Sequence, residues 1–201
     1  MRLGDIPEDV FRLAEDCETA LAPRFAEIER ISQKNTLRVM DAFHEYRVSD
    51  SCFAGTTGYG YDDLGRETLD KIYARVFGAQ KAIVRIGFVN GTHAIMSALF
   101  AAVRPGDTIL SVMGAPYDTL RTAIGADREV FGSMAFYGVK HAQVPVAEDG
   151  GPDYEAIAKA VREQAPAAVV IQRSRGYAER RALFVSEIGR LCELIKKEKP
   201  D

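Results

Sequence analysis

The sequence contains no tryptophan, only three cysteines and only three histidines among its 201 residues. Cys17, Cys52 and Cys192 lie far apart, are odd in number and form no C-x-x-C pair. This pattern argues against a disulfide framework and against a zinc site. The histidines are equally scattered, so we expect no metal centre.

Charge of one sign and long apolar runs are also lacking. Lys and Arg number 26 against 29 Asp and Glu, a net charge of −3, which gives no sign of a nucleic-acid or membrane-surface partner. No apolar run approaches the roughly 18 residues of a membrane span, and the first seven residues do not resemble a secretory signal. We therefore expect a cytoplasmic protein. Its 47% hydrophobic content excludes a disordered polyelectrolyte.

Residues 1–48 are predicted to form an N-terminal helical segment. One helix is expected to begin near Pro7, and a second to run from about Pro23 to Tyr46, with apolar residues at helical spacing. The segment contains no strand on which these helices could pack. They are expected to lie against a later part of the chain or against a second subunit.

Residues 49–78 are predicted to be a glycine- and tyrosine-rich loop followed by a helix. Asp62 or Asp63 is suited to cap the N-terminus of a helix over Leu64–Phe77. Gly78 is suited to end that helix in the left-handed conformation.

Residues 79–201 alternate between strand and helix patterns. Strands are expected at 82–86, 108–112, 139–146 and 167–171, and helices at 92–103, 117–124, 153–163 and 186–197. Such alternation predicts an α/β fold, a mostly parallel sheet with helices on both faces. The last strand is continuously apolar, as expected of a strand buried on both faces. The alternation stops after this strand and its helix, which suggests an incomplete sheet with an uncovered apolar edge and poor stability on its own.

A candidate anion site lies between the first predicted strand and its helix. Gly91 would let the backbone approach a ligand closely, and the free amides of the first helical turn, including that of Thr92, suit a phosphate. Asn90 could equally be an ordinary N-cap, and Gly91 an ordinary turn residue. His93 could touch a ligand there, or be a satisfied, partly buried histidine.

Further candidates lie in neighbouring loops. Tyr117 follows the next strand and could lie flat on a planar ring, or be a half-buried residue that starts a helix. Ser174 and Arg175 follow the last strand and could hold a carboxylate or a cofactor hydroxyl, or form a solvated basic loop.

The glycine-rich loop over residues 58–61 adds a third group of candidates. Tyr59 and Tyr61, with Arg66 beyond them, also suit phosphate, unless the tyrosines pack on a partner.

Taken in order, G-Y-G-Y-D-D-L-G-R-E-T-L, F-V-N-G-T-H-A-I, P-Y-D-T-L and I-Q-R-S-R-G-Y resemble motifs of one family. This is the aluminium-resistance protein family, which is similar to cystathionine β-lyase and methionine γ-lyase among the pyridoxal-phosphate enzymes of Cys/Met metabolism. The likeness covers nearly the whole chain. It departs at Asn90, where related enzymes usually have Ser. It implies that residues 79–201 are the first part of an aspartate-aminotransferase-like (fold type I) large domain, which is incomplete in this chain.

The resemblance also implies roles for the candidates. Gly91 and Thr92 would bind the cofactor phosphate, Tyr117 would stack on the pyridine ring, and Arg175 would lie near the ring or the substrate carboxylate. Tyr59 or Tyr61, with Arg66, would reach the phosphate of a neighbouring subunit. The implied partners are a sulfur amino-acid substrate and, in the full-length enzyme, further copies of the chain.

The resemblance also implies that the family's Schiff-base lysine follows the last residue of this chain. None of the eight lysines present lies in a motif that resembles the family's lysine loop. The sequence therefore predicts the N-terminal part of a carbon–sulfur lyase, without catalytic residues of its own. The alternative is an inactive fragment that binds phosphate or a partner. The interpretation as a nucleotide-binding Rossmann module has less support, because N-G-T-H-A lacks the glycine spacing of G-x-G-x-x-G.

Overall fold

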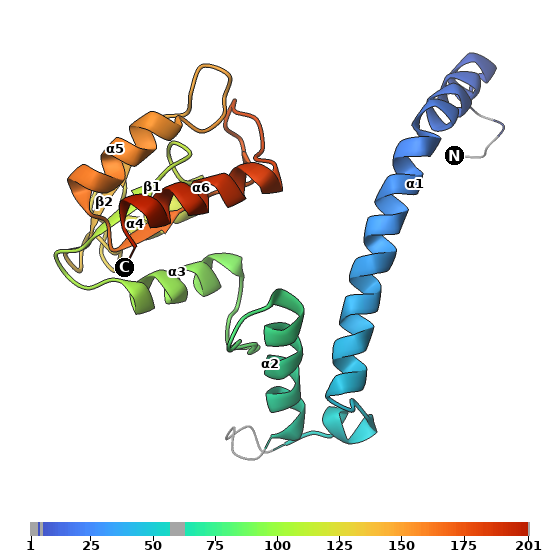
Figure 1. Ribbon diagram of the computed structural model, residues 1–201, viewed down its shortest axis with the longest axis horizontal. Helices are drawn as coiled ribbons and strands as arrows, with labels where there is room; N and C mark the ends of the chain where they lie inside the picture. Colours follow the sequence, from blue (N-terminus) through green and yellow to red (C-terminus); the bar gives the residue numbers. More distant parts are fainter. Residues whose placement is uncertain (1–3, 5, 57–62, 201) are drawn as a thin grey trace. The chain divides into compact units, whose positions relative to one another are not determined.

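A computed structural model describes residues 4, 6–56 and 63–200. The chain divides into two compact units, Met1–Ile86 and Gly87–Asp201, referred to below as unit 1 and unit 2. Figure 1 shows the elements of both units coloured along the chain.

Unit 1 begins with a single long helix, α1 (Glu8–Glu45). The predicted division into two helices near Pro23 is therefore wrong, since Pro23 lies inside α1. A proline within a helix removes one backbone hydrogen bond and favours a bend, but flanking helix-forming residues can carry the helix through it. Figure 1 shows α1 in blue as one continuous helix.

The second half of unit 1 agrees with the sequence pattern. A short 3-10 helix, η2 (Asp50–Phe53), precedes α2 (Leu64–Phe77). Asp63 caps α2 by accepting a hydrogen bond from the Arg66 amide, and Gly78 ends it with φ of 66°. The predicted cap and left-handed terminus are both confirmed.

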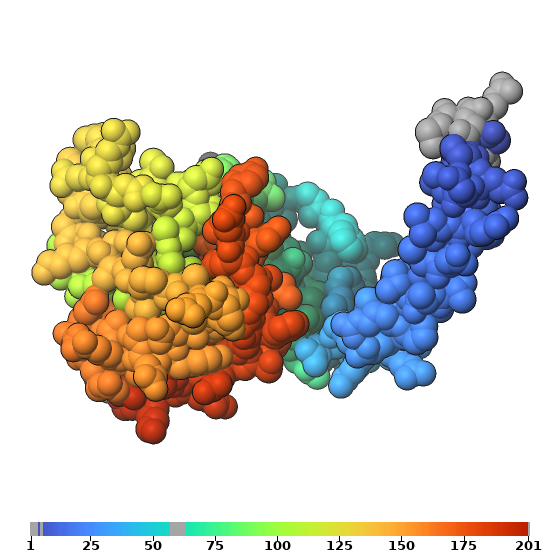
Figure 2. All heavy atoms as spheres, turned by 90° about the horizontal axis from the view of Figure 1, so that it is seen from above, coloured from blue at the N-terminus to red at the C-terminus, as the bar shows by residue number. Residues whose placement is uncertain are grey.

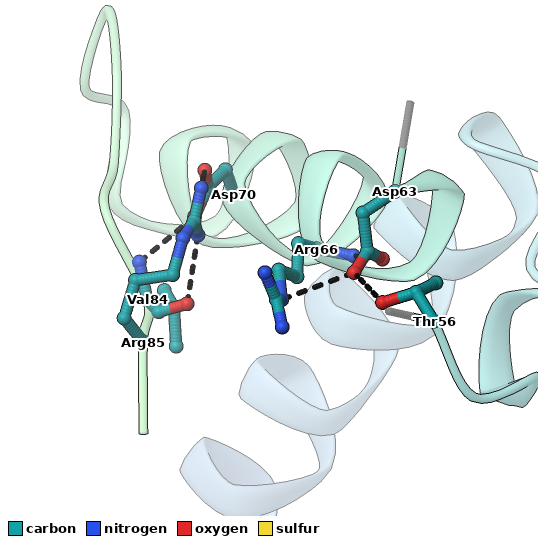
Figure 3. Close-up of polar contacts among 6 residues, drawn as sticks. All are labelled: Thr56, Asp63, Arg66, Asp70, Val84 and Arg85. Carbon is teal, nitrogen blue, oxygen red and sulfur yellow. Dashed lines mark hydrogen bonds and ion pairs between the residues drawn. The ribbon is translucent and has the colours of Figure 1, made fainter. Parts of the chain in front are cut away.

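The segment predicted as a first strand, residues 82–86, pairs with no strand in the described part of the chain. It is an extended segment held by α2 instead. The Val84 amide donates a hydrogen bond to Asp70 Oδ1 at 2.8 Å. The Arg85 guanidinium donates to both oxygens of the same carboxylate, at 2.8 and 2.9 Å (Figure 3). The strand prediction is wrong because a β-strand needs a ladder partner, whereas this backbone donor is satisfied by a side chain.

Gly65 allows η2 to pack closely on α2. A Cβ atom at Gly65 would lie 2.2 Å from the Cys52 carbonyl oxygen, well inside van der Waals contact. We predict that Gly65→Ala destabilises the protein by about 1–3 kcal/mol, because backbone must move to relieve the clash. The matched control is Gly189→Ala in another helix, where a Cβ meets nothing within 4 Å and alanine should stabilise. Urea denaturation followed by circular dichroism measures both; equal effects would contradict the prediction.

Unit 2 contains three parallel strands in the order β2-β1-β3. They are β1 (Thr108–Ser111), β2 (Lys140–Gln143) and β3 (Ala168–Val170). Each lies within a predicted strand. The prediction that the last strand is buried on both faces is wrong: the residues of β3 are only half-buried, because β3 lies at an edge of this sheet.

Helices cover both faces of the sheet. Ile109 of β1 packs with α3 (Gly91–Ala102) and α4 (Asp118–Ile124), whereas its neighbour Leu110 packs with α5 (Tyr154–Gln164) and α6 (Val185–Glu198). Successive strand residues point to opposite faces, so β1 supplies both cores. Figure 2 shows the orange and red spheres of α5 and α6 packed side by side. The predicted α/β class with a parallel sheet is confirmed.

Candidate functional site

The N-terminus of α3 presents backbone donors. Asn90 caps the helix, since its Oδ1 accepts from the His93 amide at 2.8 Å. The cap satisfies the third amide of the helix and leaves those of Gly91 and Thr92, which have no intrahelical acceptor, for another partner. A Cβ atom at Gly91 would meet nothing within 4 Å, so a ligand has room to approach this backbone. Asn90 can therefore be an ordinary N-cap while the same turn serves as an anion site, because the cap leaves the amides of Gly91 and Thr92 available to a ligand.

Three hydroxyl groups meet beside these amides. The hydroxyl of Thr92 lies 3.4 Å from Tyr117 Oη and 3.4 Å from Thr119 Oγ1. Tyr117 and Thr119 lie at the start of α4, the next element after β1. The loops that precede α3 and α4 therefore converge as predicted, although, among the described elements, only the loop before α4 follows a strand. The sequence interpretation missed Thr119. Its position two residues after Tyr117 in P-Y-D-T-L was the available signal.

The loop after β3 reaches the same place. Gly176 adopts the left-handed conformation, with φ of 58°, and a Cβ atom there would lie 3.7 Å from Tyr117 Cβ. The Tyr117 amide also donates to Gln172 Oε1 at 3.1 Å. The side chains of Ser174 and Arg175 are exposed on this loop. The structure therefore brings Thr92, Tyr117 and the loop that carries Ser174 and Arg175 to one edge of the sheet.

His93 lies against its own loop. Its ring packs edge-on to Phe88 at a centroid distance of 5.6 Å, and Nδ1 accepts weakly from the Val89 amide at 3.4 Å. The side chain is exposed rather than partly buried.

The remaining candidates belong to unit 1. Arg66 Nε lies 3.0 Å from Asp63 Oδ2, which also accepts from the Thr56 hydroxyl at 2.7 Å (Figure 3). The hydrogen bond from the Arg66 amide, followed by that from Thr56, holds the pKa of Asp63 below its usual value. Asp63 thus stays ionised and fixes Arg66 at the first turn of α2. Tyr59 and Tyr61 lie outside the described residues.

The described lysines of unit 2 lie away from the converging loops. Lys140 is the first residue of β2, at the amino edge of the sheet, and Lys159 lies on α5. Lys199 donates to the carbonyl oxygens of Ala165 and Pro166, which precede β3 and so mark the same amino edge. Lys196 and Lys197 lie in the last turn of α6.

An ion pair anchors the far end of the loop after β3. Arg181 donates to both carboxylate oxygens of Glu187, at 2.5 and 2.9 Å, and lies 3.6 Å from Asp149. The hydrogen bonds from Arg181, together with that from the Phe184 amide, lower the pKa of Glu187 to about 2.

This shift predicts a loss of stability in acid. A carboxylate whose pKa is depressed by folding stabilises the protein above its unfolded pKa of 4.5, and the contribution disappears as the pH falls toward 2. We expect Glu187→Gln to lower stability at pH 7 and to flatten the pH dependence between those values. Glu179→Gln on the exposed part of the loop serves as the control. Urea denaturation at a series of pH values measures the slope; a Glu187→Gln slope equal to that of the wild type would contradict this assignment.

The converging groups suit an anion that carries a planar ring. Two amides, the positive end of the α3 dipole and up to three hydroxyls form a donor set that fits a phosphate group. No group of three potential metal-ligating side chains occurs in the described ranges. Within those ranges, no helix has the length and hydropathy needed to span a membrane.

Comparisons with known proteins point to the same family as the sequence motifs around Gly91, Tyr117 and Arg175. The family model described as methionine gamma-lyase matches residues 10–201. Protein YnbB of Bacillus subtilis (strain 168) is 41% identical over 187 residues, which cover 92% of this chain and 44% of YnbB. The crystal structure of a carbon-sulfur lyase involved in aluminum resistance from Clostridium novyi NT is 41% identical, with a TM-score of 0.91, and the match covers 98% of this chain and 47% of that one.

A more distant structural likeness supports the fold alone. The pyridoxal-5'-phosphate dependent protein YhfS from Escherichia coli is 20% identical with a TM-score of 0.60, over 83% of this chain and 42% of that one. The chain spans about half the length of the relatives that it matches.

Proposed function

We propose a function on the premise that this chain belongs to the methionine gamma-lyase family. The chain is the N-terminal part of a pyridoxal-phosphate-dependent carbon–sulfur lyase that acts on sulfur amino acids by β- or γ-elimination. Unit 2 is the first part of an aspartate-aminotransferase-like (fold type I) large domain. The observation that carries the proposal is the convergence of the Gly91 and Thr92 amides with the hydroxyls of Thr92, Tyr117 and Thr119.

Each group has a role set by its position. The amides of Gly91 and Thr92 and the Thr92 hydroxyl hold the cofactor phosphate. Tyr117 lies on the pyridine ring, which orients the ring and excludes water from one of its faces. When bound, pyridoxal phosphate supplies an electron sink for the carbanion formed at the substrate α-carbon.

Other residues act at the edges of this site. Ser174 and Arg175 hold the substrate carboxylate or a cofactor hydroxyl, and His93 borders the phosphate. Tyr59 or Tyr61, together with Arg66, reaches the phosphate of a neighbouring subunit in a cytoplasmic homo-oligomer. The ion pair with Asp63 supports this role, because it holds the Arg66 guanidinium in one orientation.

In this proposal the chain supplies groups that bind the cofactor but not the lysine that forms the Schiff base with it. The lysines at the amino edge of the sheet support it, because ligands of parallel sheets bind at the carboxyl edge. The chain alone should therefore be inactive as a lyase. It should bind pyridoxal phosphate reversibly, through the phosphate and the ring.

Titration with pyridoxal phosphate, followed by borohydride reduction and peptide mapping, tests the proposal. We expect a saturable change in cofactor absorbance that inorganic phosphate competes away, and no lysine that is modified selectively. Selective reduction onto one lysine would overturn the assignment of the Schiff base to a residue outside this chain. Failure to bind at millimolar cofactor would overturn the cofactor site.

A further inference from the structure

The loop after β3 contains a buried arginine that no role above explains. Arg180 is only 5% exposed. Its Nη2 donates to the carbonyl oxygens of Gln172 and Ser174 at 3.1 and 2.7 Å, and its Nη1 to that of Arg181 at 3.2 Å. Burial lowers the pKa of Arg180. A buried guanidinium is costly unless its donors are satisfied, and here backbone carbonyls of one loop satisfy them.

Gln172 connects this loop to the start of α4. Its Oε1 accepts from the Tyr117 amide at 3.1 Å, and its Nε2 donates to the Ser174 carbonyl at 2.9 Å. The two contacts require the same orientation of the side-chain amide, since one partner is a donor and the other an acceptor. The Ser174 carbonyl thus receives donors from both Gln172 and Arg180.

The backbone of the loop also passes near Tyr117. The left-handed Gly176 turns the chain back toward Tyr117, where a Cβ atom would come within 3.7 Å of Tyr117 Cβ. The Leu183 amide donates to the Arg173 carbonyl at 3.2 Å and closes the base of the loop. Tyr117 therefore has a fixed neighbour on the side of β3.

We propose that Gln172 and Arg180 are positioning residues, which together fix the Tyr117 backbone relative to the turn that carries Ser174. The inference rests on the proposed function, in which Tyr117 lies on the ring and Ser174 and Arg175 border it. Neither Gln172 nor Arg180 touches the ligand. Gln172 fixes the position of the Tyr117 backbone amide, from which the ring-stacking side chain extends. Arg180 holds the Ser174 carbonyl, which in turn orients the side-chain amide of Gln172.

Hydrogen exchange of the Tyr117 amide tests this arrangement without any ligand. In the 201-residue chain, Gln172→Met should raise the exchange rate at Tyr117 by about tenfold, because the only side-chain acceptor described for this amide is lost. Gln172→Glu keeps an acceptor and should leave the rate near that of the wild type. Gln164→Met, at the exposed end of α5, is the matched control and should change nothing. Unchanged exchange in Gln172→Met would overturn the proposal.

Circular dichroism of bound pyridoxal phosphate tests the consequence for the ligand. Gln172→Met and Arg180→Met should alter the induced signal of the cofactor and weaken its binding by about tenfold, while Arg180→Lys should restore part of both. An unaltered signal and affinity in Gln172→Met would show that the pair does not position the ring. If the wild-type chain binds no pyridoxal phosphate, the proposed function fails, and the exchange experiment still decides whether Gln172 holds Tyr117.

Discussion

Replacing Gly91 with leucine is expected to abolish cofactor binding while leaving the fold intact. A Cβ atom at Gly91 meets nothing within 4 Å, so a larger side chain starts in open space. This side chain starts at the residue whose own amide, with that of Thr92, is proposed to hold the phosphate, so we expect it to compete with the phosphate for space. We expect the affinity for pyridoxal phosphate to fall by at least about 100-fold, or about 2.7 kcal/mol.

The measurement is a cofactor titration paired with thermal unfolding. Gly91 is the first residue of α3, and replacing a helical glycine with leucine should keep or raise the unfolding temperature. Gly189→Leu in α6 is the matched control, because a side chain there also enters open space but lies away from the converging loops. If Gly91→Leu binds the cofactor as tightly as Gly189→Leu does, the phosphate does not lie at the start of α3.

Local signals in the sequence predicted the features that depend on a few neighbouring residues. The sequence narrows the N-cap of α2 to Asp62 or Asp63, of which Asp63 is the cap, and identifies Gly78 as the left-handed terminus. Each feature depends on one residue's own side chain, or on the lack of one. The position of Tyr117 at the carboxyl edge of the sheet followed from the order of β1 and α4, since carboxyl ends of parallel strands share one edge. The helix start at Gly91 was also predicted, although no strand precedes it in the described part of the chain. These predictions required no knowledge of distant contacts.

Features that depend on a distant partner were not predictable in the same way. Residues 82–86 have the composition of a strand, but their conformation is set by Asp70 on α2. Pro23 usually marks a helix boundary, yet α1 continues through it. Burial of 167–171 was overestimated because a sequence does not show which strand lies at the edge.

The candidate site shows the same division. Thr92 and Tyr117 were named from their loops, whereas the contact between Thr92 and Thr119 joins residues 27 positions apart. The hydrogen bond from Tyr117 to Gln172 spans 55 positions, and no short motif encodes it. Long-range polar contacts of this kind require the register of β1 against β3, in which Ser111 lies opposite Val170.

That register places Leu110 at the centre of one of the two cores of unit 2. Leu110 is fully buried, lies between Ala142 of β2 and Val169 of β3, and packs with Ile157 of α5 and Leu191 of α6. We predict that Leu110→Ala lowers the free energy of unfolding by about 2–5 kcal/mol, because it removes buried methyl groups and leaves a cavity. This is a large part of the 5–15 kcal/mol typical of a folded protein.

The absence of tryptophan dictates how this is measured. Far-ultraviolet circular dichroism in urea follows the loss of total helix, to which α5 and α6 contribute and whose packing on β1 the substitution weakens. Val185→Ala at the start of α6 is the control, because that side chain is 74% exposed and its removal leaves no cavity. A loss of less than about 1 kcal/mol for Leu110→Ala would mean that β1 is not the central strand of a packed sheet. A large loss that also weakens cofactor binding would show that the register of β1 holds Tyr117 in place.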